Sequence, residues 1–128
     1  RSTIAIANLY HFNEKGELHG EQKTFYPTGV TKTLLCYDNG VLHGLKGLWD
    51  EKGNLLEESK YVNGKLEGRH FEKDQEGREI VYHYKNNKRE GPHYVYYPED
   101  VTEGEKVKAI EASYKNNKLH GEAIEYDP

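Results

Sequence analysis

The sequence predicts an all-β protein: an elongated, single-layer antiparallel β-meander of about ten strands, built from about five repeats of ~24 residues. Three observations support this fold class. A motif ending in His-Gly or Glu-Gly recurs along the chain, and its glycines at 20, 44, 68, 91 and 121 are separated by 24, 24, 23 and 30 residues. Two kinds of turn motif alternate within each period. The segments between turns are rich in Tyr, Thr, Leu, Val and Ile and are too short for a stable helix.

The repeated motif reads YDNGVLHG at residues 37–44 and YVNGKLEG at residues 61–68. Further copies are YKNNKREG at 84–91 and YKNNKLHG at 114–121, and a copy one residue longer, FNEKGELHG, occupies 12–20. A fixed period of this size is typical of a linear array in which each unit packs on its neighbours. We therefore expect a single domain over residues 1–128, with repeat units at about 1–31, 32–55, 56–79, 80–108 and 109–128.

Each period holds two turns with different chemistry. The first is Asn-Gly at 39–40 and 63–64 and Asn-Asn at 86–87 and 116–117. These pairs tolerate positive φ at both central positions and favour a type I′ hairpin. The second turn is a loop that ends in glycine, at 29, 53, 77 and 104, where glycine suits the left-handed position. The turns divide the chain into strands expected at 3–12, 21–26, 31–38, 45–50, 55–62, 69–73, 78–85, 93–97, 107–115 and 122–126.

Period-two alternation gives the longer strands two distinct faces. The more apolar face, which we expect to be the inner one, carries the repeat tyrosines Tyr37, Tyr61, Tyr84 and Tyr114. A second aromatic row lies five residues beyond the repeat glycines, at Phe25, Trp49, Tyr96 and Tyr126, with Phe71 substituting for Lys73 in the third repeat. We expect the two rows to interleave into one aromatic ladder.

The fourth repeat is longer than the others by about six residues, which lie within the acidic stretch 98–108. A local insertion of this kind maps to one protruding loop. We expect a longer hairpin tip, so that removing residues 99–106 leaves stability unchanged. A loop that contacts a partner is the alternative.

Composition narrows the class of function. Of the 128 residues, 34% are apolar and 31% are charged, and 11 are tyrosines, so the core is expected to be thin and aromatic. The net charge is −4 without a basic stripe, which argues against nucleic-acid and anionic membrane partners. No segment approaches the ~20 apolar residues of a membrane span.

The compartment is not readable from the sequence. The single cysteine, Cys36, excludes an internal disulfide. Because the chain begins at Arg1 and contains no methionine, we expect a processed chain or a fragment. Both the cytoplasm and the cell envelope therefore remain open as its location.

Three histidines at one repeat position, His19, His43 and His120, suggest a metal site. Equivalent positions in successive repeats are two strands apart, or about 10 Å, whereas zinc requires each donor nitrogen within about 2.1 Å. We therefore expect no metal, and we expect these side chains to cover the turn and to hydrogen-bond the backbone of a neighbouring strand.

No arrangement of residues predicts catalysis. Glu57 and Glu58 are adjacent in a strand and point to opposite faces. Ser59 and Ser113 lie in mid-strand without a nucleophile-elbow motif, and Cys36 is expected to be a buried, inert thiol. The glycines are single and repeat-spaced, so no phosphate loop is present. We expect a protein that is not an enzyme, with no catalytic residues and no cofactor.

The aromatic residues suggest binding instead, because exposed Tyr and Trp are enriched at protein interfaces. Four rings add to or exceed the ladder and are the candidate binding residues: Trp49, Tyr82, Tyr94 and Tyr97. The open end strands offer a second route, since an unpaired edge accepts a strand from a partner. Edge-to-edge homodimers are compatible with such edges.

The Tyr-x-Asn-Gly-x-Leu-His-Gly motif and the aromatic residue that follows it resemble MORN-type repeats in their bacterial variant form. The resemblance extends from about Phe12 to Tyr126 and departs from the pattern at Lys73, Asn87, Arg89 and Asn117. It implies a non-enzymatic protein–protein interaction module, and in its specific form the antitoxin-like component of a bacterial toxin–antitoxin system. The alternative is a carbohydrate-binding module of the cell envelope that uses the aromatic rows.

Overall fold

The computed structural model describes residues 4–127 and contains thirteen strands and no helix in that range. Every strand pairing described is antiparallel, which confirms the all-β antiparallel meander. Within the described residues, no helix is long and apolar enough to cross a membrane. The chain divides into two compact units, Arg1–Lys65 and Leu66–Pro128, which are described in turn. The expected single domain stays a prediction.

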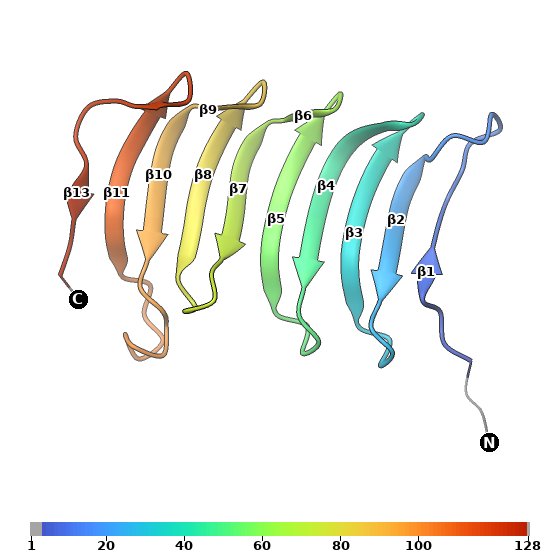
Figure 1. Ribbon diagram of the computed structural model, residues 1–128, viewed down its shortest axis with the longest axis horizontal. Coiled ribbons are helices and arrows are strands. Elements are labelled where there is room, and N and C mark those ends of the chain that lie inside the picture. Colours follow the sequence, from blue (N-terminus) through green and yellow to red (C-terminus); the bar gives the residue numbers. More distant parts are fainter. Residues whose placement is uncertain (1–3, 128) are drawn as a thin grey trace. The chain divides into compact units, whose positions relative to one another are not determined.

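The first unit is a sheet whose strands lie side by side in chain order (Figure 1). It comprises β1 (Asn8–Leu9), β2 (Gly20–Phe25), β3 (Thr31–Asp38), β4 (Val41–Trp49) and β5 (Leu55–Val62). The short β6 (Lys65–Leu66) spans the division between the units in the sequence. In the register, each repeat glycine lies opposite the tyrosine of the next repeat, as Gly20 opposes Tyr37 and Gly44 opposes Tyr61.

The second unit follows the same plan. It comprises β7 (Gly68–Lys73), β8 (Glu79–Lys85), β9 (Lys88–Arg89), β10 (Gly91–Tyr96), β11 (Lys108–Lys115), β12 (Lys118–Leu119) and β13 (Ile124–Glu125). Its main strands are ordered β7-β8-β10-β11; β9 pairs with β8, and both β12 and β13 pair with β11. Gly68 opposes Tyr84 and Gly91 opposes Tyr114, which repeats the register of the first unit.

The strand count exceeds the expected ten because the repeat glycines interrupt the ladder. Before Gly68 and Gly91, which have φ of 81° and 97°, two of the three residues that follow the turn form the short strands β6 and β9, whereas β4 continues through Gly44. The first strand, expected at 3–12, is reduced in the described residues to β1 and an isolated bridge between Phe12 and Leu18. Residue 3 lies outside the described part.

The predicted type I′ turns are confirmed. Asn39 and Gly40 have φ of 45° and 86°, and Asn86 and Asn87 have φ of 50° and 68°. Asparagine and glycine are the residues that adopt this left-handed region at least cost.

An aspartate closes two of the glycine-ending loops. Asp50 Oδ1 accepts hydrogen bonds from the backbone N–H groups of Lys52 and Asn54, both at 2.9 Å. Asp74 repeats the arrangement with Glu76 and Arg78. The backbone hydrogen bond from Asn54 is the main cause that lowers the pKa of Asp50.

Each type I′ turn also bonds to the repeat before it. In the turn at 63–64, Gly64 N–H donates to the carbonyl oxygen of Leu42 at 2.7 Å, and Asn63 N–H donates to His43 Nδ1 at 3.1 Å. We call this pair of hydrogen bonds the turn lock. The other three turns repeat it with the acceptor pairs Leu18/His19, Leu66/Glu67 and Arg89/Glu90.

The turn lock explains why His and Glu alternate before the repeat glycines. The imidazole Nδ1 of His19 or His43 and the carboxylate Oε2 of Glu67 or Glu90 all accept the same kind of backbone N–H. His19 and His43 therefore bond backbone as expected, but the donor is an N–H of the following turn rather than of a neighbouring strand. His120 is exposed, and its own backbone N–H donates to Ser113.

The two aromatic rows lie on opposite faces of the sheet, so the expected single ladder is wrong. In the second unit, Tyr82 pairs with His70 on one face, whereas Phe71 pairs with Val81 on the other. Tyr96 pairs with Glu79 and therefore shares the face of Phe71. The repeat glycine shares the face of the repeat tyrosine, and an odd spacing of five residues then places the second row on the opposite face.

Burial is divided between both faces, which corrects the expectation of one inner face. The buried apolar residues Phe71 and Val81 lie on one face of the second unit, and Val95 and Ala112 lie on the other. Four buried polar side chains accompany them: Gln22, Ser59, Glu79 and His93. A single layer exposes both faces to solvent, so neither face becomes a conventional core.

The insertion at 98–108 contacts a buried carboxylate. Lys106 Nζ lies 2.8 Å from Oε1 of Glu79, whose side chain is only 9% exposed. The same ammonium group lies 5.3 Å from the ring centroid of Tyr96. The insertion is therefore more than a hairpin tip, and the expectation that its removal leaves stability unchanged no longer follows.

We predict that Lys106→Met lowers the free energy of unfolding by about 1–3 kcal/mol, because a carboxylate with little solvent access loses its charged partner. Urea unfolding followed by circular dichroism measures the change. Lys88→Met is the matched control, since Lys88 is exposed in β9. Equal stability of the two variants would show that the Glu79–Lys106 pair contributes nothing.

Candidate functional site: a groove beside Trp49

The four candidate binding residues are divided between the two units. Trp49 ends β4 in the first unit, whereas Tyr82 in β8, Tyr94 in β10 and Tyr97 beyond β10 belong to the second. All four side chains are half-buried. Tyr82 and Tyr94 lie on opposite faces, because Tyr94 pairs with Val81, the residue before Tyr82. Each ring therefore has to be assessed in its own surroundings.

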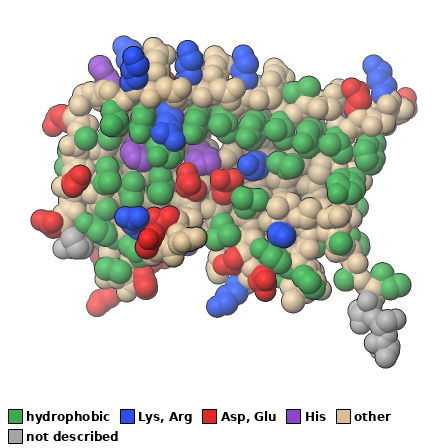
Figure 2. All heavy atoms as spheres, in the orientation of Figure 1, with side chains coloured by type: hydrophobic (Ala, Val, Ile, Leu, Met, Phe, Trp, Pro, Cys, Tyr) green, Lys and Arg blue, Asp and Glu red, His purple; other side chains and the backbone are tan. Residues whose placement is uncertain are grey.

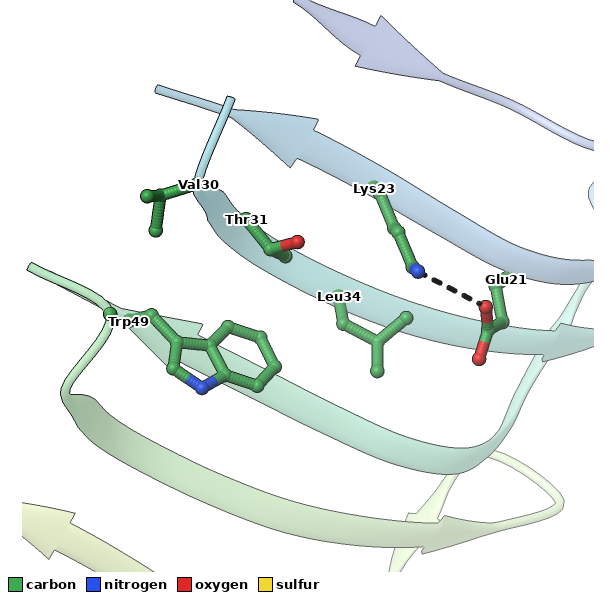
Figure 3. Close-up of a pocket in the computed structure, with 7 residues that line it drawn as sticks. Glu21, Lys23, Val30, Thr31, Leu34 and Trp49 are labelled. Atoms are coloured by element: carbon green, nitrogen blue, oxygen red, sulfur yellow. Dashed lines mark ion pairs between the residues drawn. The ribbon is translucent and has the colours of Figure 1, made fainter. Parts of the chain in front are cut away.

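Trp49 lines a groove of about 370 Å³ on one face of β2, β3 and β4. Figure 3 shows Leu34 between the Trp49 ring and the charged end of the groove. There, Lys23 Nζ lies 3.5 Å from Glu21 Oε1. The full lining is Glu21, Lys23, Val30, Thr31, Leu34, Trp49 and Gly53.

The position of the Trp49 ring depends on Gly47. Gly47 and Trp49 are two residues apart and therefore point to the same face of β4. The indole ring lies where a side chain at position 47 would be, because a Cβ atom at Gly47 would come within 2.4 Å of Trp49 Cη2. The hydroxyl of Tyr26 donates to the carbonyl oxygen of Trp49 at 2.7 Å and fixes the backbone at this point. The indole is thus held along β4 with its outer part half-exposed to the groove.

The groove combines apolar walls with one pair of charged groups. Its walls are apolar at Val30, Leu34 and Trp49, and its charged groups are already paired with each other. No cluster of three or more His, Cys, Asp or Glu side chains that suits a metal ion occurs in residues 4–127. Cys36 is half-buried rather than fully buried and lies opposite Glu21 in the register.

Tyr82 belongs to an aromatic cluster in the second unit. Its ring stacks on His93 with centroids 4.4 Å apart and an interplanar angle of 12°. The guanidinium carbon of Arg89 lies 3.9 Å from the Tyr82 centroid, and Tyr114 packs edge-on at 5.9 Å. Figure 2 shows histidine side chains among hydrophobic side chains over this unit. Tyr82 therefore packs within the second unit, and its role as a contact residue for a partner stays a prediction.

His93 is the buried member of this cluster. Its Nδ1–H donates to the carbonyl oxygen of Val81 at 3.0 Å. Burial lowers the pKa of His93, and the positive charge of Arg89 lowers it further, while the bond to Val81 opposes both. His93 is consequently neutral at pH 7. Burial likewise raises the pKa of the Tyr82 hydroxyl.

The other two candidates have different surroundings. Tyr94 lies 6.2 Å from Tyr96 between ring centroids, with Lys108 Nζ at 4.8 Å from its ring, and it lines a second groove near β13. The Tyr97 hydroxyl donates to the carbonyl oxygen of Tyr126. Tyr97 therefore helps to hold the C-terminal segment to the second unit.

In the comparisons with known proteins, no protein-family model matches this chain, and no curated protein sequence matches it. The MORN-type resemblance therefore stays a prediction.

Sequence reasoning found Trp49 but not the rest of the groove. Gly47, two residues before Trp49, could have predicted where the indole ring lies, because a glycine on the same face of a strand makes room for a large ring. Leu34 and the Lys23–Glu21 pair join Trp49 only through the register of three strands, which the sequence does not specify.

We predict that Gly47→Ala displaces the Trp49 ring from β4 and exposes it. Because Trp49 is the single tryptophan, its fluorescence emission should shift to longer wavelength and become more accessible to acrylamide. Overpacking of this kind costs about 1–3 kcal/mol of stability. Leu45→Ala, at an exposed position of the same strand, is the control and should leave the emission unchanged. An unaltered spectrum in Gly47→Ala would contradict the packing of Trp49 against Gly47.

We predict that His93 makes the second unit less stable in mild acid. A histidine whose folded-state pKa is depressed binds fewer protons folded than unfolded, so the stability it supports is lost as the pH falls through the unfolded value of about 6.5 toward the folded one. The free energy of unfolding should therefore decrease between pH 7.5 and pH 5. His93→Gln, compared over the same range by urea unfolding, should show a shallower decrease. Parallel profiles for the two proteins would refute the assignment.

Proposed function

We propose that this chain is a protein-interaction module and that the groove beside Trp49 receives an apolar side chain of a partner protein. The observation that carries the proposal is the half-exposed indole, held in place by Gly47 and Tyr26 at the edge of an open groove. A ring fixed in advance loses little conformational freedom on binding.

The composition of the groove supports a protein partner. Interfaces concentrate their binding energy in a few buried aromatic anchors surrounded by polar groups. Here Trp49 and Leu34 supply the apolar centre, and the Lys23–Glu21 pair supplies a polar rim on one side. The volume of about 370 Å³ suits one or two side chains rather than an extended ligand.

The specific form of the proposal is the antitoxin-like component of a bacterial toxin–antitoxin system, with a toxin as the partner. It is supported only by the resemblance of residues 12–126 to MORN-type repeats of the bacterial variant form. Because the chain has a net charge of −4, a partner with a neutral or basic surface would be electrostatically compatible with it.

A carbohydrate ligand is the second candidate, because polar groups flank the indole. Thr31, Lys23 and Glu21 lie within the same groove as Trp49, and an aromatic ring beside hydrogen-bonding groups is suited to sugar rings. Both candidates use the same residue, so the identity of the ligand decides between them.

The test is an affinity purification from lysate and envelope fractions of the source organism, followed by calorimetry with the purified ligand. We expect one stoichiometric protein whose affinity falls at least about 30-fold in Trp49→Ala, the loss typical of an interface hot spot. Leu45→Ala is the matched control and should bind as the wild type does. Retention on glycan with the same dependence on Trp49 would favour the carbohydrate candidate. Unchanged binding in Trp49→Ala would exclude the groove as the site.

A further inference from the structure

Two turns of the second unit carry an identical Lys-Asn-Asn-Lys sequence, at 85–88 and 115–118. In the register, Lys85 lies directly opposite Lys88, and Lys115 lies directly opposite Lys118. We call these four lysines the lysine edge. Like charges that lie directly opposite each other in a ladder are destabilising, so each pair opposes the hairpin that it flanks.

Hydrogen bonds hold the second of these turns against the strand that leaves the first. Asn117 N–H donates to the carbonyl oxygen of Arg89 at 3.0 Å, and Arg89 N–H donates to Asn117 Oδ1 at 2.8 Å. Arg89 directly follows Lys88, so the two turns are about two strands, or roughly 10 Å, apart. This distance is comparable with the Debye length of about 10 Å at about 0.1 M salt, and the charges of both turns therefore act together on a ligand.

All four lysines lie on one face of the sheet. Val81, Tyr94 and Glu111 share a face, because Tyr94 pairs with Val81 in β8 and with Glu111 in β11. Lys85 is four residues beyond Val81, and Lys115 is four residues beyond Glu111, so both share that face by alternation. Figure 2 shows Lys and Arg side chains along the edge where these turns lie.

The lysine edge is exposed and has no carboxylate partner of its own. All four side chains are exposed, and none of the ion pairs in the described part of the chain involves them. The carboxylates of Glu67 and Glu90 accept backbone N–H groups in the turn locks instead. Lys85 and Lys88 stay exposed although the turn at 115–118 lies beside them, so exposure belongs to the turns themselves.

The turn lock does not require lysine at these positions. It uses backbone N–H groups of the turn and acceptors of the preceding repeat. In the turn at 39–40 the flanking positions hold Asp38 and Val41, which pair in the same way, and the lock is intact there. The lysines therefore oppose folding without serving the lock, which points to a role in binding.

A groove of about 290 Å³ is lined by residues of both turns: Lys85, Asn86, Lys88, Glu90 and Asn116. Its ammonium groups attract anions, and its amide side chains both donate and accept hydrogen bonds. Glu90 Oε2 accepts the N–H of Asn116 at 2.8 Å, and a carboxylate has further acceptor sites for an N–H of a ligand. An acidic peptide offers both carboxylates and N–H donors, whereas the phosphate backbone of a nucleic acid has no donor for Glu90.

We propose that the lysine edge binds an acidic segment of a partner protein. Asp or Glu side chains of the segment pair with the lysines of both turns, and its backbone N–H groups face Glu90. An extended segment advances about 3.3 Å per residue, so carboxylates three or four residues apart reach both turns. The lysine edge belongs to the second unit and the groove beside Trp49 to the first, and neither proposal depends on the other.

The experiment is fluorescence anisotropy of the full chain with a fluorescein-labelled peptide of the sequence GEDEEDEG, at about 50 mM salt. Replacing all four lysines of the edge by glutamine should weaken binding about 30-fold, because each exposed ion pair contributes a factor of about two to three. Raising the salt to about 300 mM should weaken binding to the wild type far more than to this variant, since screening acts on the charges that the variant lacks.

The matched control removes the same charge from exposed positions elsewhere, with the substitutions Lys15→Gln, Lys52→Gln, Lys60→Gln and Lys73→Gln. This variant has the same net charge as the first and should retain most of the binding. Equal weakening in the two variants would show that only the net charge of the chain matters, which would overturn the proposal.

Urea unfolding separates binding from a structural role. The variant without the lysine edge should be at least as stable as the wild type, because it loses two like-charge pairs. Trp49→Ala should bind the acidic peptide as the wild type does, which distinguishes this site from the proposed function. A loss of stability in the lysine-edge variant, no binding of the peptide at about 50 mM salt, tighter binding of an oligothymidylate, or sedimentation showing that a second copy covers the lysines would each overturn the proposal.

Discussion

The turn lock is the interaction on which each unit depends. A type I′ turn holds two consecutive residues at positive φ, so that both of their N–H groups point away from their own hairpin. Asn63 and Gly64 direct these donors to His43 and Leu42, and the other three turns do the same. Because the two partners lie 19 or more residues apart in the chain, the bonds fix one repeat against the next rather than one hairpin within itself.

The turn lock is needed for stability because a single-layer sheet buries few side chains. Four apolar and four polar side chains are buried in the described residues, far fewer than a two-layer domain of this length provides. Two of the buried polar side chains bond backbone groups of a neighbouring segment. Gln22 bonds both the N–H and the carbonyl oxygen of His11, and His93 bonds Val81. Side-chain hydrogen bonds to backbone therefore add to the cohesion of neighbouring segments.

The local parts of the fold could be predicted from the sequence, and the relations across strands could not. The bounds of β3 and β5 match the expected 31–38 and 55–62, because strong turn signals lie on both sides of each strand. The interleaved aromatic ladder was wrong, because it counted spacing without assigning a face to the repeat glycine. The Glu79–Lys106 pair and the contact of Tyr82 with Arg89 and His93 depend on register and on a loop path. The period-two alternation of the sequence specifies neither the register between strands nor the path of a loop.

The residue before the repeat glycine has to supply one hydrogen-bond acceptor rather than one particular side chain. His43 Nδ1 accepts from the N–H of Asn63 at 3.1 Å, and Glu90 Oε2 accepts from the N–H of Asn116 at 2.8 Å. An imidazole and a carboxylate therefore fill the same role in the turn lock. The motif can accordingly end in either His-Gly or Glu-Gly without a change in the pairing of the repeat glycine with the next repeat tyrosine.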